Sequence, residues 1–287
     1  MRIASTLIVT SLLISGAHAA DYLRGAIPSE PPRAAPSPSY DWSGFYAGAQ
    51  VGYQAMKTDH SKIGTNLTAA TFPGIEPSQL SASLLTFGSA EAKGRAYGFF
   101  AGYNTMWDDV VIGGEFEYNR PSLIASQYVG PFAHRTASKS TTGNLWDTAI
   151  DGTAQTAIDD YAVGKIRVGV AYDRFMPFVT AGVAVARMTT RANSLGATQE
   201  YQLQPITDPV TNAITGYNRI NITGVIVGNG QTKTSGIQWG YAFGAGMDVA
   251  VTDAIFLRGS WEYLGFGGDK ASRTSLNTVK GGAGVKF

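Results

Sequence analysis

Apolar and polar side chains alternate with a period of two along most of the chain after residue 44. In the segment 45–53, Phe45, Val51 and Tyr53 share one parity, whereas Gln50 and Gly52 lie on the other. Successive side chains of a strand point to opposite faces, so this pattern predicts a β-strand with one apolar face. The same alternation recurs in seven further segments: 96–106, 110–118, 160–172, 179–185, 238–249, 255–263 and 278–287.

The connections between these segments alternate strictly between short and long. The short ones are 107–109, 173–176 and 250–253, and the long ones are 54–94, 119–159, 187–237 and 264–275. Outer-membrane barrels have short periplasmic turns and long extracellular loops, and a tilted membrane strand needs about ten residues. The sequence therefore predicts an all-β fold, an eight-stranded antiparallel transmembrane up-and-down barrel with both termini in the periplasm. The segments 201–204 and 220–227 are expected to extend strands beyond the membrane.

The rival with the same strand pattern is a soluble lipocalin-like barrel, whose apolar face points inward. Here the less apolar parity is rich in glycine, for example Gly48, Gly98 and Gly244, which suits the narrow interior of a small barrel. The large apolar side chains must then face lipid. Aromatic side chains near the strand ends are expected to form two girdles at the headgroup level: Tyr53, Tyr97, Tyr118, Trp239, Trp261 and Tyr263 near the long loops, and Phe45, Tyr103, Tyr172 and Phe287 near the short turns.

The N-terminal segment has the features of a secretory signal. A basic start at Arg2 precedes an apolar core and the small residues Ala17 and Ala19, which predicts a signal peptide over 1–19. A membrane-anchoring helix, the alternative, needs about 20 apolar residues. The segment 20–40 contains the run IPSEPPRAAPSPS and is predicted to be a Pro-rich periplasmic linker, and 41–287 is predicted to be the barrel.

Composition excludes several classes of function. Of the 287 residues, 15% are charged, well below the roughly 25% of an average soluble domain. Loss of the leader, which contains Arg2, leaves no net charge, so no nucleic-acid partner is expected. The chain has no cysteine, which excludes disulfides, thiolate metal sites and cysteine nucleophiles.

The segment Asp41-Trp42-Ser43-Gly44-Phe45 and the strand that follows it, placed after a Pro-rich linker, carry a resemblance to a known family. They resemble the first strand of the porin-like outer-membrane β-barrel family of alphaproteobacterial surface antigens, and more distantly the barrel domain of OmpA. The terminal Phe287 is similar to the aromatic end of outer-membrane proteins. The resemblance implies an outer-membrane protein with a porin label and occasional hemin-binding or host-interaction roles. It also implies an assembly signal at Phe287 that the barrel-insertion machinery recognises.

Several charged residues carry the inward parity and are expected to form ion pairs in the lumen. Glu115 falls at nearly the depth of Lys165 and Arg167, and Glu262 falls near Lys280. Unpaired charges in a low-dielectric interior cost several kcal/mol each. A gated or ion-selective lumen is one interpretation, but the narrow interior of eight strands favours ion pairs that fill the barrel. The complete set of candidate lumen charges is Glu115, Glu117, Lys165, Arg167, Arg258, Glu262 and Lys280.

Catalytic and ligand-binding residues are sparse. The mature chain has two histidines, His60 and His134, both in predicted surface loops and both expected to be solvated. Asp59, His60 and Ser61 are adjacent in sequence, whereas the members of a catalytic triad are brought together by the fold. The protein is therefore not expected to be an enzyme, and no metal or cofactor is expected. His60 and His134 remain candidate hemin ligands.

These observations predict a structural outer-membrane protein that contributes to envelope integrity and surface display, with minor small-solute porin activity as an added possibility. The alternative is a hemin-binding or adhesion receptor that acts through the long extracellular loops. The expected partners are outer-membrane lipids, the barrel-insertion machinery and a host or hemin ligand at the loops.

Overall fold

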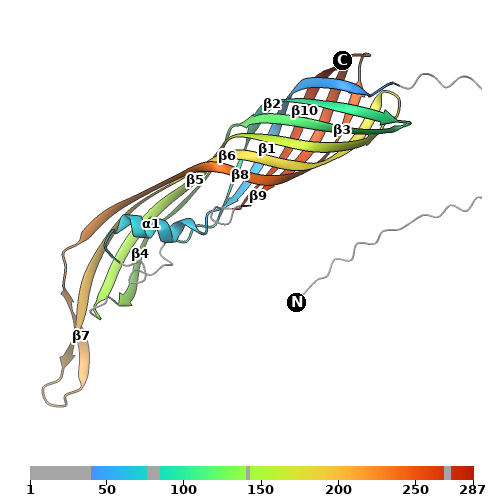
Figure 1. Cartoon of the computed structure of the whole chain (residues 1–287). Coiled ribbons are helices and arrows are strands. Elements are labelled where there is room, and N and C mark those ends of the chain that lie inside the picture. Colours follow the sequence, from blue (N-terminus) through green and yellow to red (C-terminus); the bar gives the residue numbers. More distant parts are fainter. Residues whose placement is uncertain (1–39, 76–84, 140–142, 268–272) are drawn as a thin grey trace, which may run out of the picture. The chain divides into compact units, whose positions relative to one another are not determined.

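The computed structural model describes residues 40–75, 85–139, 143–267 and 273–287, so the predicted signal peptide and nearly all of the predicted linker lie outside the described residues. The described chain contains one helix and ten strands (Figure 1). Their bounds are β1 Gly44–Asp59, α1 Ile63–Thr71, β2 Ser89–Trp107, β3 Val110–Pro121, β4 Leu123–Lys139, β5 Leu145–Val170, β6 Phe175–Thr207, β7 Ile214–Asn221, β8 Ile226–Ala250, β9 Ile255–Phe266 and β10 Thr274–Lys286.

Eight of the strands form a closed antiparallel ring in the order β1, β2, β3, β5, β6, β8, β9 and β10. The ring closes because β1 also pairs with β10, with Ala49 opposite Ala283. Closure pairs the backbone groups of every ring strand on both sides, which hydrocarbon requires. The predicted eight-stranded up-and-down architecture is confirmed.

The three short connections are tight turns. Asp108, between β2 and β3, and Asp173, between β5 and β6, both have a positive φ, of 49° and 53°. Aspartate adopts this left-handed conformation more readily than most residues. The third turn, between β8 and β9, is closed by hydrogen bonds from the N–H groups of Val251 and Thr252 to the carbonyl of Ile255. Because neighbouring strands of the ring are antiparallel, these turns after β2, β5 and β8 lie at the same end of the ring.

Two of the expected long loops are largely strand, which corrects the predicted connections 119–159 and 187–237. β5 has 26 residues and β6 has 33, and their pairing continues as far as Leu145 opposite Tyr201. Within the described ranges, β4 follows β3 after Ser122 and pairs only with β5, and β7 pairs with the far end of β6. The predicted extensions at 201–204 and 220–227 lie mainly in β6, β7 and β8, as expected. Strand pairing therefore continues past the ring as a sheet of β4, β5, β6 and β8 (Figure 1).

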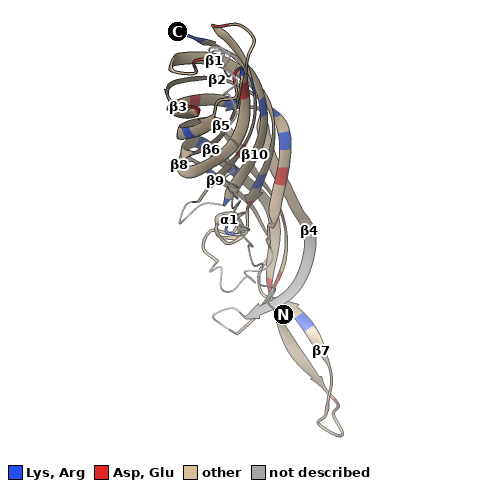
Figure 2. Ribbon diagram, turned by 90° about the vertical axis from the view of Figure 1, so that its right-hand side faces the viewer, with Lys and Arg blue, Asp and Glu red and all other residues tan. Residues whose placement is uncertain are grey.

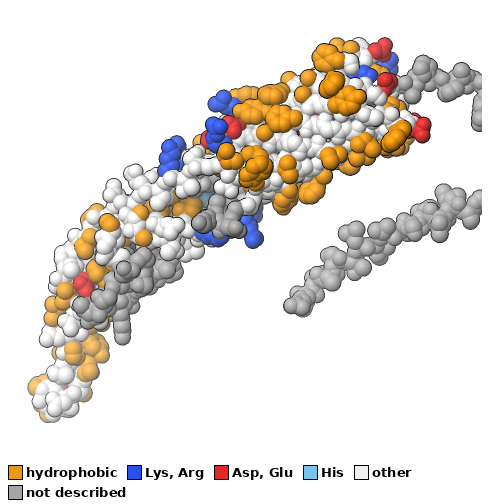
Figure 3. Space-filling model, in the orientation of Figure 1, with side chains coloured by type: hydrophobic (Ala, Val, Ile, Leu, Met, Phe, Trp, Pro, Cys, Tyr) orange, Lys and Arg blue, Asp and Glu red, His pale blue; other side chains and the backbone are white. Residues whose placement is uncertain are grey.

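The two faces of the ring have opposite character. The outward face carries exposed apolar side chains such as Val51, Phe99, Ile166 and Val183, and they form a band over the ring strands (Figure 3). The predicted aromatic girdle residues all carry this parity, and most of them are exposed. Because a solvated exterior would not be covered by such residues, this distribution fits lipid on the outside.

The interior of the ring is filled in layers. An apolar layer at the turn end contains Trp42, Tyr46, Phe100, Phe178 and Phe256. A second apolar layer, built around Met56, Tyr161, Met188, Leu264 and Phe266, lies toward the opposite end. Buried charged side chains lie between these layers. A third apolar cluster contains Leu67 of α1, Phe72, Phe87 and Trp146 and lies on the sheet extension.

Within the described residues, no helix has both the length and the apolar character to cross a bilayer.

Candidate functional site

Among the described residues, the charged side chains inside the ring come from five strands. β3 supplies Glu115 and Glu117, β5 supplies Lys165 and Arg167, and β8 supplies Asp248. Arg258 and Glu262 come from β9, and Lys280 comes from β10. All eight are buried, and Figure 2 marks the acidic and basic positions along the strands. They carry the inward parity because each lies an even number of residues from the other inward positions of its strand.

The half of this network nearer the turns is centred on two arginines. Arg258 donates to both carboxylate oxygens of Asp248, at 2.7 and 2.9 Å, and to Oε2 of Glu115 at 2.7 Å. Arg167 donates to Asp248 at 2.7 Å and lies 3.4 Å from Glu115. The Tyr46 hydroxyl donates to Glu115 at 2.7 Å. Two guanidinium groups and two carboxylates thus share short, charge-assisted hydrogen bonds, which are the stronger kind.

The half nearer the opposite end uses lysines. Lys280 donates to Glu117 at 2.6 Å and to Glu262 at 2.8 Å. Lys165 donates to Glu117 and, at 3.1 Å, to Glu262. The Lys165 ammonium also lies 3.2 Å from Oε1 of Glu115, which connects the two halves. Each ammonium is therefore held by at least two carboxylates.

The network is electrically balanced, with four cationic and four anionic side chains. Neutral polar groups satisfy remaining acceptor positions: the Gln50 amide donates to Glu117 at 3.1 Å and to Asn119 at 2.8 Å. Buried charges cost several kcal/mol each unless they are paired and hydrogen-bonded. The charge balance and the hydrogen bonds together reduce the free-energy cost of burying these eight side chains.

Aromatic rings stack against the cationic side of the network. The guanidinium of Arg258 lies 4.1 Å from the ring centre of Phe100, and that of Arg167 lies 4.1 Å from the ring centre of Phe178. Phe100 also lies 6.1 Å from Phe256, centre to centre. Cations over aromatic faces gain about 0.5–2 kcal/mol when partly desolvated. The aromatic layer therefore packs against the two guanidinium groups on the side of the turns, and its rings fill the lumen there.

The structure brings together all seven lumen charges named from the sequence. Glu115 is the direct register partner of Lys165, and Glu262 contacts Lys280. The sequence interpretation missed Asp248, which makes some of the shortest contacts of both arginines. It also missed Tyr46 and Gln50. The inward parity of Asp248 was visible in the sequence, and the excess of four basic over three acidic residues among the seven named charges was the signal for a further acid.

The two histidines lie in different settings from those expected. The expectation that His60 is solvated is wrong: its side chain is fully buried, and its Nε2 lies 2.9 Å from the Thr156 hydroxyl oxygen. Burial lowers the pKa of His60, while the nearby Asp59 carboxylate partly opposes this effect. Nδ1 has no hydrogen-bond partner among the described residues. His134 lies in β4 opposite Thr148, not in a loop, and the structure describes only its backbone.

The C-terminal residue Phe287 follows the last residue of β10. Its side chain is 80% exposed on the outside of the ring, and its N–H donates to the carbonyl of Phe45 at 2.8 Å. The terminal aromatic is thus fixed at the β1–β10 closure, at the turn end of the outward face.

The comparison with protein families decides the wider class. The family model described as outer membrane protein beta-barrel domain matches residues 8–287. The chain belongs to this outer-membrane barrel family. Its place in the outer membrane follows from the family, and it agrees with the apolar outward face of the ring.

Relatives within the family are surface antigens. The chain is 23% identical over 290 residues to the 25 kDa outer-membrane immunogenic protein of Brucella ovis, with all of both chains covered. It is 27% identical over 189 residues to the 31 kDa outer-membrane immunogenic protein of Brucella melitensis, with 64% of this chain and 66% of the relative covered. The expected membership of an outer-membrane surface antigen family is confirmed.

Solved structures of small outer-membrane barrels are also similar. Neisserial surface protein A matches with a TM-score of 0.34 and 14% identity. The alignment covers 85% of this chain and 98% of the Neisserial chain. The attachment invasion locus protein Ail of Yersinia pestis matches with a TM-score of 0.29 and 13% identity, covering 85% and 99%. These scores are too low to support a functional comparison.

Proposed function

We propose that the protein is a structural outer-membrane barrel that supports the envelope and displays a rigid sheet outside the cell. The observation that carries this proposal is the filled lumen. A balanced network of eight charged side chains lies between two apolar layers inside the ring. An eight-stranded barrel is only wide enough for its own side chains, so a filled interior leaves no continuous path for solutes.

Planar-bilayer recordings of the purified full chain test the closed lumen. We expect no sustained conductance from the native protein, with a large porin as the positive control in the same bilayers. The double variant Lys165→Ala, Glu117→Ala removes one buried pair and widens the interior, and we expect it to conduct measurably. Steady conductance of the native protein would refute the structural role and support a porin.

The display role depends on the orientation of the ring. We infer that the short turns and both termini face the periplasm and that the extended strands face outward, because long connections lie outside in this class of barrel. The tip between β6 and β7 offers a sharp test, since Val210 is 89% exposed there. An epitope inserted after Val210 should bind antibody on intact cells, and the same epitope between Asp108 and Asp109 should not. The reverse labelling would overturn the orientation.

A second candidate function is adhesion through the hairpin of β6 and β7. The hairpin exposes Val210, Ile214 and Tyr217, and among the described residues β7 pairs only with β6, which leaves its second edge without a strand partner in that part of the chain. Open edges and exposed apolar residues are typical of contact surfaces. Deleting 208–213 and joining the strands by a two-residue turn should abolish binding to host cells if the hairpin is an adhesin. Unchanged binding would reject this function.

Hemin binding is the other part of this alternative. The burial of His60 and its hydrogen bond to Thr156 leave no accessible nitrogen for an iron ligand on that side chain. A hemin titration of His60→Gln and His134→Gln separates the two residues. We expect no effect of His60→Gln on any hemin absorbance change.

A further inference from the structure

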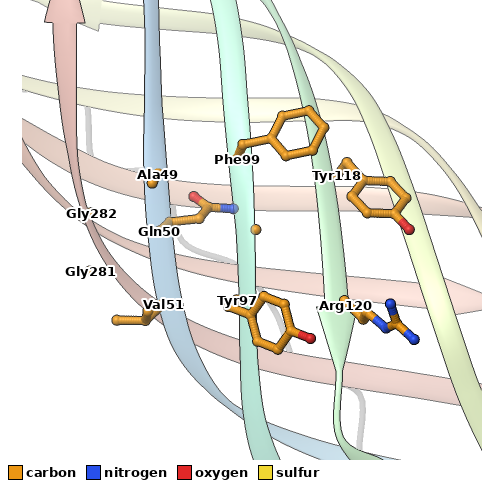
Figure 4. A pocket seen from close by; sticks show the side chains of 10 residues that line it. Ala49, Gln50, Val51, Tyr97, Phe99, Tyr118, Arg120, Gly281 and Gly282 are labelled. Atoms are coloured by element: carbon orange, nitrogen blue, oxygen red, sulfur yellow. The ribbon is translucent and has the colours of Figure 1, made fainter.

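A groove runs over the outer surface of the ring across β10, β1, β2 and β3. Its volume is about 590 Å³ (Figure 4). Tyr97, Phe99 and Tyr118 form one wall, with Phe99 and Tyr118 stacked at 5.4 Å between ring centres. Ala49 and Val51 lie along it on β1, and the floor includes Gly281. A Cβ added at Gly281 would meet no atom within 4 Å, so this glycine leaves open space on the outward face.

The end of the groove toward the extended strands is cationic. Arg120 lines the groove and is the register partner of Tyr97. Arg95 lies two residues beyond Tyr97 on the same face of β2, which is about 7 Å along the strand, and Lys93 follows two residues further. The carbonyl of Arg95 accepts a hydrogen bond from Ser122, which places Arg95 diagonally beside Arg120.

These three cations have no acidic partner in the part of the chain that the structure describes. All three are exposed, and none of them forms an ion pair with another described residue. Lys57, on the neighbouring strand β1, differs because its ammonium lies 3.3 Å from Glu91. On the face that Figure 3 shows, basic side chains gather where the apolar band meets the sheet extension. Three like charges at this boundary repel one another unless an anion lies between them.

The position of the groove indicates what it holds. It opens onto the lipid-facing band, and its cationic end lies beside the aromatic residues expected at the headgroup level. An acyl chain fits the apolar part, and phosphate oxygens fit two neighbouring guanidinium groups, which bind phosphate bidentately. A free phosphate ion would make no use of the apolar groove. A single ligand that has both parts is a phosphorylated lipid.

We propose that Lys93, Arg95 and Arg120 bind the phosphates of a phosphorylated, acylated glycolipid of the outer leaflet, with one acyl chain in the groove over Gly281. This assignment to the outer leaflet rests on the orientation proposed above. The bound lipid would neutralise the basic cluster and cover the β1–β10 closure of the ring.

Native mass spectrometry of the folded full chain in detergent provides the test. The probe is bisphosphorylated lipid A, titrated beside its dephosphorylated form, phosphatidylglycerol and inorganic phosphate. The double variant Arg95→Gln, Arg120→Gln should weaken lipid A binding by about tenfold or more, because hydrogen bonds to charged groups are the strong ones. Gly281→Leu fills the groove and should also weaken binding, with the phosphate contacts intact.

Matched controls separate the site from general effects. Gly164 is also an outward glycine with open space around it, so Gly164→Leu should leave binding unchanged. Arg191 and Lys233 are exposed register partners elsewhere on the sheet, and their replacement by Gln should have no effect. Every variant is first checked for its folded, heat-modifiable band.

Three results would overturn the proposal: equal binding of native and double-variant protein, equal binding of dephosphorylated lipid A, or no preference for lipid A over phosphatidylglycerol. Loss of binding in the Gly164→Leu control would do so as well. Because this measurement uses detergent, it does not depend on orientation. A reversed orientation in the epitope test would refute the display role and move the site to the inner leaflet, while the lipid measurement would still report on the site.

Discussion

Neutralising Glu115 is the most direct test of the lumen network. In the variant Glu115→Gln, the side chain keeps its size but loses its charge, so the interior carries one excess positive charge. Lys165, Arg167 and Arg258 each lose one carboxylate contact, at 3.2, 3.4 and 2.7 Å respectively. The Tyr46 hydroxyl can still donate to the amide oxygen.

The expected size of the effect follows from the partners that remain. Removing one member of a buried pair typically costs about 3–5 kcal/mol. After Glu115→Gln, both arginines keep Asp248, and Lys165 keeps Glu117 and Glu262. No cation is left without a carboxylate, so we expect a loss near the lower limit, about 3 kcal/mol in the free energy of unfolding. Asp248→Asn should cost more, because it removes the closest carboxylate of Arg167 and one with two short contacts to Arg258.

A balanced double variant separates charge from packing. Glu115→Gln combined with Arg167→Gln restores neutrality and leaves Arg258 with Asp248. We therefore expect the double variant to lose less stability than the sum of the two single variants, with a coupling energy of about 1–3 kcal/mol. Simple loss of packing predicts additive effects.

Urea unfolding of the protein refolded into lipid vesicles, followed by tryptophan fluorescence and by the heat-modifiable gel band, measures these energies. Coincidence of the two probes checks that unfolding is two-state. A stability loss below about 1 kcal/mol for Glu115→Gln, or strict additivity in the double variant, would contradict the view that excess buried charge in the lumen controls stability here.

Three further predictions concern other parts of the chain. Ile166 is 64% exposed in the middle of the outward face, so Ile166→Lys should make insertion less favourable by about 2–4 kcal/mol, while Ile255→Lys beside a turn should cost about 0–1 kcal/mol; equal refolding yields would refute the assignment of the faces. Deleting Phe287 should reduce the folded fraction in cells and leave refolding of purified protein nearly unchanged, and an unaltered folded fraction would exclude an assembly role. Burial holds the pKa of His60 below its usual value, so the unfolded state binds a proton more readily, and the protection factors of the α1 amides against hydrogen exchange should fall as the pH drops below about 6.5; in His60→Gln this loss of protection should vanish.

The ring itself was predictable because lipid imposes a simple rule on each strand. Where hydrocarbon surrounds the chain, every second side chain must be apolar, as in Val179, Ala181 and Val183, and the strand is visible in the sequence. Beyond the membrane, the outward face of β6 meets water and carries residues such as Arg187, Thr189 and Arg191. The pairing continues there, but the apolar alternation that marks it does not, so the extensions were predicted to be loops except at 201–204 and 220–227.

The side-chain contacts inside the ring were less predictable than the arrangement of its strands. Parity showed that Asp248 faces inward, but its contacts with Arg167 and Arg258 depend on the register of three strands and on arginine length. The helix α1 was missed because its sequence, IGTNLTAAT, contains three threonines and one glycine, which are weak helix formers. Its burial against the sheet extension, together with that of His60, is a tertiary effect that local sequence does not carry.

The lumen network also has a meaning for assembly. Its eight charges come from strands that are far apart along the chain, and Lys280 of β10 meets Glu117 of β3 only after the last strands have joined the ring. A partly assembled barrel therefore holds unmatched charges, and a slip of one residue in any of the five strands that carry them would turn charged side chains toward lipid. The interior therefore favours the correct strand register over the alternatives. Only in the correctly closed ring do all eight charged side chains lie inside, where their net charge is zero.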